Sequence, residues 1–166
     1  MIMKILQITA ATKNSCYEHC MQFHPDIKVL RPEIDDWATG TKIKPGVILE
    51  HLHMADALLW VDADCSVELP ETAPNMDFDI GVFDNIITRH KNKISAAFIL
   101  FRNNENARHF LKKWQQNNLK RRLDHPALIA TINQTQETCK IVNLSDWLKG
   151  RCIVNAHLPN RTQAAG

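Results

Sequence analysis

The sequence lacks several features that would define its class at once. No stretch approaches the roughly 18 consecutive apolar residues that a membrane-spanning helix needs. The apolar start Met1–Ile5 runs into polar residues by Thr12, so we expect neither a signal peptide nor a membrane anchor. There is no Gly/Ser-rich linker, internal repeat or low-complexity tract. Nothing therefore marks an interdomain boundary.

The chain also lacks a charge excess of either sign. It carries 20 Lys and Arg against 18 Asp and Glu, a formal net charge of +2. This balance argues against nucleic acid or an anionic membrane as the main partner, so any basic function must be local. The basic runs at 89–93 and 120–122 are compatible with an anionic acceptor or with ordinary solvated segments.

The number of cysteines is odd, so they cannot all form disulfide pairs within the chain. Five scattered cysteines without an export signal predict reduced thiols, a cytoplasmic location and no disulfide framework. The remaining composition is that of an ordinary soluble globular protein, with 45% hydrophobic and 23% charged residues. At 166 residues, one compact core is the expected outcome.

Short apolar runs alternate with helical patterns along the chain, which predicts an α/β domain with a largely parallel sheet covered on both faces. The expected strands are Lys4–Ala10, Lys28–Leu30, Ala57–Val61, Phe78–Phe83, Ser95–Phe101, Lys140–Val142 and Cys152–Asn155. One helix is expected from Pro45, one around Ala107–Trp114 with Asn103-Asn104 as its cap, and a short one from Pro126.

The most informative motif follows the apolar run Ala57–Val61. Asp62 and Asp64 come directly after this strand, and prolines break the chain soon afterwards. Ligands of open α/β sheets bind beyond the carboxyl ends of strands, and paired carboxylates there suit a hard cation such as Mg²⁺ or Mn²⁺. The alternative is that the two aspartates only cap a turn.

Several segments together resemble GT-A-type glycosyltransferases. Lys44–Leu49 followed by Leu58–Asp64 is similar to the central part of that family, where a Lys-Pro helix precedes an apolar strand ending in Asp-x-Asp. Later family segments are matched in the same order by Phe78–Val82, Ser95–Asn103, the helix with Trp114, Leu123–Leu128 and Ile153–His157. The chain departs from the family pattern at Ala96-Ala97, at His125 and in a shortened N-terminal segment.

The resemblance implies a single GT-A-like domain over residues 1–161 and a flexible tail over residues 162–166. The expected fold is a Rossmann-like sandwich with a mostly parallel central sheet flanked by helices. The implied activity is transfer of a sugar from a nucleotide-diphosphate donor, with Mn²⁺ or Mg²⁺ as cofactor. The acceptor would be a saccharide, a protein or a lipid-linked molecule, and neither a nucleic acid partner nor a membrane span is expected.

The resemblance also implies roles for single residues. Asp62 would contact the metal through water, or the ribose, while Asp64 would ligate the metal directly. His157 would complete the ligand set, unless it is an ordinary surface histidine.

Three other residues belong to the implied site. Asp124 is the candidate for contacting the transferred sugar or the acceptor, and a simple helix N-cap is the competing interpretation. Lys44 and Arg161 are candidate counter-charges for the donor's diphosphate, although exposed cations are usually just solvated.

Two other functions remain open at this stage. An Asp-x-Asp after an apolar strand is also typical of phosphatases that form an aspartyl-phosphate, with Asp62 as nucleophile and Asp64 as acid/base. That motif normally begins its domain, however, whereas here a strand and a helix precede it. The second alternative is a GT-A-like domain with reduced catalysis that serves binding or regulation.

Overall fold

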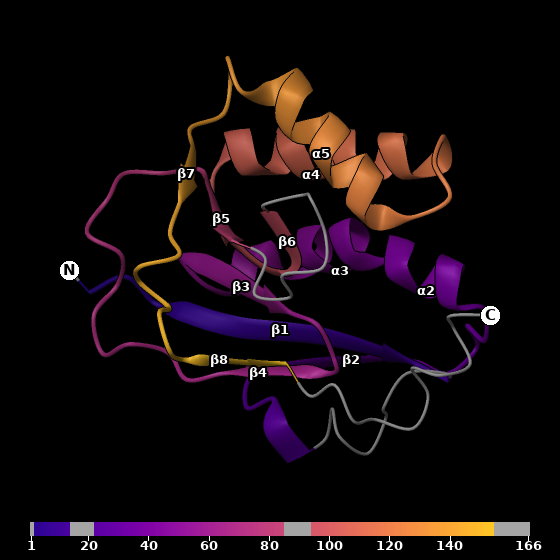
Figure 1. Ribbon diagram of the computed structural model, residues 1–166, viewed down its shortest axis with the longest axis horizontal. Coiled ribbons are helices and arrows are strands. Elements are labelled where there is room, and N and C mark those ends of the chain that lie inside the picture. Colours follow the sequence, from indigo (N-terminus) through magenta and orange to yellow (C-terminus); the bar gives the residue numbers. More distant parts are fainter. Residues whose placement is uncertain (1, 14–21, 85–93, 155–166) are drawn as a thin grey trace.

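A computed structural model describes residues 2–13, 22–84 and 94–154 (Figure 1). Its centre is a six-stranded sheet in the order β2-β1-β3-β6-β5-β7. The strands are β1 (Ile5–Thr12), β2 (Ile27–Arg31), β3 (Ala57–Val61), β5 (Ile80–Asp84), β6 (Ile94–Arg102) and β7 (Ile141–Asn143).

The sheet is mostly parallel, as the sequence predicts. β1 pairs in parallel with β2 and with β3, and β5 pairs in parallel with β7. Only β6 runs the other way, antiparallel to both β3 and β5. A parallel crossover needs about a dozen residues or more, and the connection between β5 and β6 consists of residues 85–93 alone. The short connection therefore explains the reversed strand.

Helices cover one face of the sheet. They are α2 (Trp37–Lys42), α3 (Lys44–His51) with the short 3₁₀ turn η1 (Leu52–Met54), α4 (Glu105–Leu119) and α5 (Asp124–Thr135). Leu58 and Trp60 of β3 lie in the same core as Phe110 and Trp114 of α4. Because side chains alternate along a strand, the even-numbered residues of β3 face the helices.

The opposite face carries a small second sheet. β4 (Cys65–Val67) and β8 (Cys152–Val154) pair antiparallel, and Figure 1 shows them beneath β1. Leu59 and Val61 of β3 pack there with Cys65, Leu144 and Leu148. The sandwich thus has helices on one side and a β-ribbon with its connecting loops on the other.

The seven expected strands are all present, with ends shifted by at most two residues. The helix around Trp114 is confirmed, and Asn104 caps it by accepting a hydrogen bond from the Ala107 N–H. Two elements were not predicted, namely β4 and α2. One residue in the sequence could have indicated α2. The Asp36 carboxylate accepts a hydrogen bond from the Thr39 N–H as an N-cap, and Asp is a preferred residue at that position. Among the described helices, none combines the length and the apolar character needed to cross a bilayer.

Candidate functional site

The two aspartates of the Asp-x-Asp motif lie at the carboxyl edge of the sheet. Asp62 directly follows β3 and continues its ladder, since its N–H donates to the Ala97 carbonyl of β6 at 3.0 Å. The Asp62 carbonyl then accepts from the Cys65 N–H at 2.9 Å, which closes a tight turn into β4. By the alternation of β3, the Asp62 side chain lies on the helix side of the sheet.

A buried lysine joins two carboxylates at this edge. The Lys44 ammonium lies 2.8 Å from Asp62 Oδ1 and 2.7 Å from Asp124 Oδ2. Its side chain is only 8% exposed, against 27% for Asp62 and 9% for Asp124. The three residues come from three elements, α3, the end of β3 and α5, and 80 residues of sequence separate the lysine from Asp124.

The surroundings hold Lys44 and Asp62 in place. Lys44 is the first residue of α3, and its ammonium also donates to the Ala96 carbonyl at 3.2 Å. The ammonium lies 5.9 Å from the centre of the Trp60 ring, within range of a cation–π contact. The Trp60 indole N–H in turn donates to Asp62 Oδ1 at 2.7 Å. Asp62 Oδ1 therefore receives two donors.

Asp124 does not act as the N-cap of α5. The N-cap position belongs to Leu123, which makes no side-chain capping bond, and Asp124 is the first helical residue. Its carboxylate contacts Lys44 instead. The neighbouring His125 ring Nε2 lies 2.9 Å from the Ile94 carbonyl, which fastens the start of α5 to the start of β6. The capping interpretation is therefore wrong for this residue.

Burial and charge act in opposite directions on the cluster. Burial alone disfavours a charged ammonium, but the two carboxylates outweigh it, and the pKa of Lys44 lies above its ordinary value. Burial raises the pKa of Asp62; Lys44 opposes this rise, whereas the charges of Asp64 and Asp124 add to it. The single positive charge of Lys44 thus does not fully balance the negative charge around Asp62.

The thiol of Cys65 reports the same negative surroundings. Burial raises its pKa, and the negative charges of Asp62 and Asp64 raise it further. Lys44, Asp62, Asp64 and Asp124 together carry one positive and three negative formal charges. A divalent cation would neutralise this excess, and carboxylate oxygens are the donors that Mg²⁺ and Mn²⁺ prefer.

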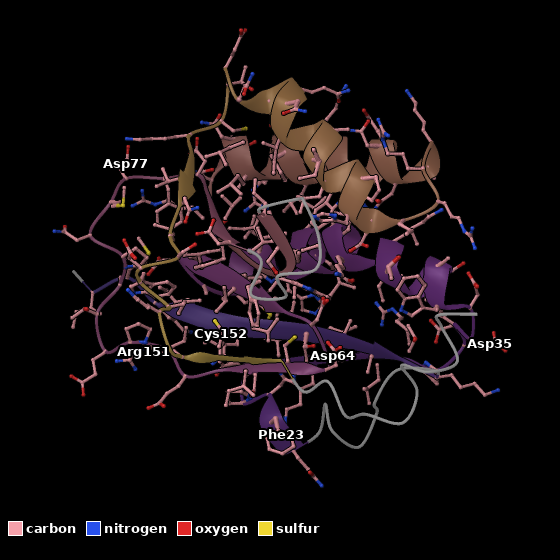
Figure 2. All side chains as sticks on the ribbon, in the orientation of Figure 1. Phe23, Asp35, Asp64, Asp77, Arg151 and Cys152 are labelled. Atoms are coloured by element: carbon pink, nitrogen blue, oxygen red, sulfur yellow. The ribbon has the colours of Figure 1, made fainter. Side chains whose placement is uncertain are left out.

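Asp64 is the second aspartate of the motif and directly precedes β4. It lies in the turn between β3 and β4, half-buried, and accepts a weak hydrogen bond from the Cys65 thiol at 3.4 Å (Figure 2). Within the described parts of the chain, no three His, Cys, Asp or Glu side chains are grouped closely enough to hold a metal ion. A metal here would need further ligands from elsewhere.

The structure brings together three of the six predicted site residues at short distance, Lys44, Asp62 and Asp124, with Asp64 two positions further along. His157 and Arg161 lie outside the described residues. The expected contact of Lys44 with a diphosphate stays a prediction, since its two carboxylate partners already account for its position. Sequence reasoning did not find the Trp60 indole or the Ala96 carbonyl, and no sequence signal marks either as part of a polar cluster.

Neither a comparison with models of known protein families nor a search of curated proteins finds a match for this chain. Solved structures do match. The chain is similar to a glycosyltransferase involved in the glycosylation of the major capsid of PBCV-1, with a TM-score of 0.63 and 9% identity over 97% of both chains.

Two further solved structures score lower. A197 from STIV has a TM-score of 0.48 at 14% identity, covering 86% of this chain and 82% of that one. The glycosyltransferase GlyE of Streptococcus pneumoniae TIGR4 has a TM-score of 0.47 at 11% identity, covering 88% and 46% respectively. At 9% identity, the first likeness concerns architecture alone, and it establishes that this chain has a glycosyltransferase-like fold.

Proposed function

We propose that this chain is a metal-dependent glycosyltransferase of the GT-A type, which transfers a sugar from a nucleotide-diphosphate donor to an acceptor. One observation carries the proposal. Two carboxylates, Asp62 and Asp124, hold a single buried lysine at the carboxyl edge of a glycosyltransferase-like sheet, where ligands of open α/β sheets bind, and Asp64 follows Asp62 by two residues. This site has the excess negative charge that a divalent cation requires.

The proposed metal ligands are Asp62, Asp64 and His157, with Asp62 acting through water or on the ribose. The pairing of the small sheet supports the third ligand. β8 ends at Val154, which lies opposite Cys65, the residue that follows Asp64. His157 comes three residues later, and three residues span at most about 10 Å. A chain of this length is compatible with His157 as a ligand beside Asp64.

The protein's own groups prepare the site before any substrate arrives. When bound, a divalent cation supplies charge stabilisation for the departing nucleotide diphosphate. Lys44 holds Asp62 through Oδ1, which leaves Oδ2 as the oxygen that we assign to the ligand. Asp124 orients Lys44, and we assign it the contact with the transferred sugar or the acceptor. Lys44 and Arg161 are proposed to offset the diphosphate charge.

The proposal is tested by measuring binding of nucleoside diphosphates and their sugars with Mn²⁺ and with a chelator, by thermal shift and calorimetry. Binding to the folded state raises the melting temperature by mass action. We expect stabilisation that needs both Mn²⁺ and one nucleotide, lost in Asp64→Asn. The matched control is Asp146→Asn, which removes the same charge from an exposed turn residue.

The outcomes separate the alternatives. Transfer of the sugar to an acceptor or to water supports the enzyme, whereas metal-dependent binding without any turnover supports a binding or regulatory domain. Phosphatase activity that disappears in Asp62→Asn favours the aspartyl-phosphate alternative. Undiminished metal-dependent binding in Asp64→Asn would remove the basis for the metal site.

A further inference from the structure

The segment that forms α4, α5 and their connection has a charge unlike that of the rest of the chain. Between residues 105 and 135, from the start of α4 to the end of α5, lie six of the 20 Lys and Arg residues but only two of the 18 acidic residues, Glu105 and Asp124. Asp124 is buried against Lys44, and Glu105 lies in the first turn of α4, at the end of that helix away from the connection. The remainder of the chain carries 14 basic and 16 acidic residues, so the basic charge is concentrated here.

The connection between the two helices combines this charge with exposed aliphatic groups. Leu119, the last residue of α4, is 88% exposed, and Lys120, Arg121 and Arg122 after it are all exposed. A shallow groove of about 470 Å³ adjoins them on α5, lined by Arg121, Pro126, Ile129, Ala130, Asn133 and Gln134. We call residues 119–122 and this groove the α4–α5 patch.

The apolar part of the α4–α5 patch is aliphatic. The two Phe or Trp residues of the segment, Phe110 and Trp114, are fully buried in the core. Single-stranded nucleic acid is usually held by exposed aromatic rings on which bases stack, and this patch has none among its residues. An exposed leucine beside Lys and Arg is instead the composition of surfaces that lie on anionic membranes.

We propose that the α4–α5 patch docks the protein on an anionic phospholipid surface, with Leu119 entering the interface and the three cations contacting lipid headgroups. This goes beyond the proposed function, and it agrees with the overall charge balance because the basic residues are local. The connection between α4 and α5 lies on the side of the molecule where β1 ends, as Figure 1 shows. Asp124 follows Arg122 by two residues, so docking brings the candidate site to the membrane.

The proposal is tested by sedimentation with phosphatidylcholine vesicles and with vesicles that contain about 30% phosphatidylglycerol. We expect salt-sensitive binding to the anionic vesicles only. Each headgroup-contacting cation contributes about 1 kcal/mol, so the double variant Arg121→Ala/Arg122→Ala should bind roughly 30-fold more weakly. The matched control, Lys149→Ala/Arg151→Ala, removes the same charge from exposed positions beside β8 and should bind as the unmodified protein does.

Two further variants define the contact. Leu119→Ser should weaken binding severalfold without unfolding the protein, because the side chain is almost fully exposed already. Asp64→Asn should bind vesicles normally, which separates membrane docking from the proposed metal site. Absence of binding to anionic vesicles, equal losses in the two double variants, or tighter binding to a single-stranded oligonucleotide than to vesicles would each overturn the proposal.

Discussion

Two clusters of three charged residues lie at opposite edges of the sheet and are inverses of one another. At the carboxyl edge, Lys44 stands between two carboxylates. At the amino edge, Asp77 stands between two cations, 2.9 Å from Arg102 and 3.1 Å from Lys140. Figure 2 labels Asp77 on the left and Asp64, beside the first cluster, to its right.

Burial separates the two clusters more than geometry does. The Asp77 side chain is 73% exposed, whereas that of Lys44 is 8% exposed. Exposed ion pairs are screened by water and contribute little to stability. A buried charge that loses its partner is costly, because nothing replaces the lost solvation. Ion pairs of similar length therefore contribute little at the exposed amino edge, whereas at the carboxyl edge they hold a buried cluster of charges.

The largest expected effect comes from removing the central charge of the buried cluster. Lys44→Met would leave two carboxylates facing each other without a cation, and we expect a loss of about 3–5 kcal/mol in the free energy of unfolding. Urea denaturation followed by circular dichroism measures this loss. Lys140→Met is the matched control at the exposed cluster, and its denaturation midpoint should not move measurably. Equal midpoints for the two variants would contradict the contrast drawn from burial.

The second-largest expected effect is stabilisation by a divalent cation, which should depend on the carboxyl-edge cluster and not on the amino-edge cluster. At a Mn²⁺ concentration about 100 times the dissociation constant, linkage predicts a stabilisation of about 2.7 kcal/mol. Asp77→Asn should retain this stabilisation, because its cluster has an excess of positive charge. Asp64→Asn should lose it. Thermal melts with Mn²⁺ and with a chelator make the measurement, and an unchanged response in Asp64→Asn would argue against a cation at the carboxyl edge.

A smaller loss is expected when Asp124 becomes neutral. Asp124→Asn keeps an oxygen near Lys44 but removes one of its two negative partners, which should cost about 2 kcal/mol. Chemical denaturation gives the value, and a double variant with Lys44→Met tests the coupling. The two losses should be strongly non-additive, since both changes act on one interaction. Additive losses would mean that the two residues act independently.

The smallest expected effect is the change in stability at acidic pH that depends on Asp77. A hydrogen bond and the charge of Lys140, together with Arg102, hold the pKa of Asp77 below its ordinary value of 3.8. Near and below that pH, the unfolded chain binds more protons than the folded chain, so the contribution of Asp77 is lost as the pH falls through its folded pKa. Unfolding curves from about pH 5 to about pH 3 should therefore converge for the unmodified protein and Asp77→Asn. Curves that diverge on acidification would reverse the sign assigned here.

The sequence predicted those parts of the fold that short-range patterns determine. The run Ala57–Val61 is apolar at every position, and β3 has these same bounds because the strand is buried on both faces. β4 has only three residues, two of them half-buried, so it carries too little pattern to be recognised. The segment Trp37–Lys42 contains Gly40 and two threonines, which are poor helix formers, and only its capping residue Asp36 indicates α2.

The candidate site also has a part that the sequence predicts and a part that it does not. Asp62 and Asp64 could be placed at the sheet edge because they follow a recognisable strand. The contact of Lys44 with Asp124 could not be predicted, since it depends on how α3 and α5 pack across 80 residues of chain. Neither helix carries a local signal that its first residue faces the other. Lys44 was expected to face a diphosphate, and that role remains a prediction.

The long sequence separations at the site determine when it can form during synthesis. A chain that ends before Asp124 can bring Lys44 to Asp62 but has only one of the two carboxylates that balance the buried ammonium. β4 likewise has no partner until β8 has left the ribosome, because Cys65 pairs with Val154. Long-range contacts of this kind close late in folding. A nascent chain can therefore build its hydrophobic layers well before it acquires the ordered cluster at the carboxyl edge, which forms only when nearly all of the described chain has been made.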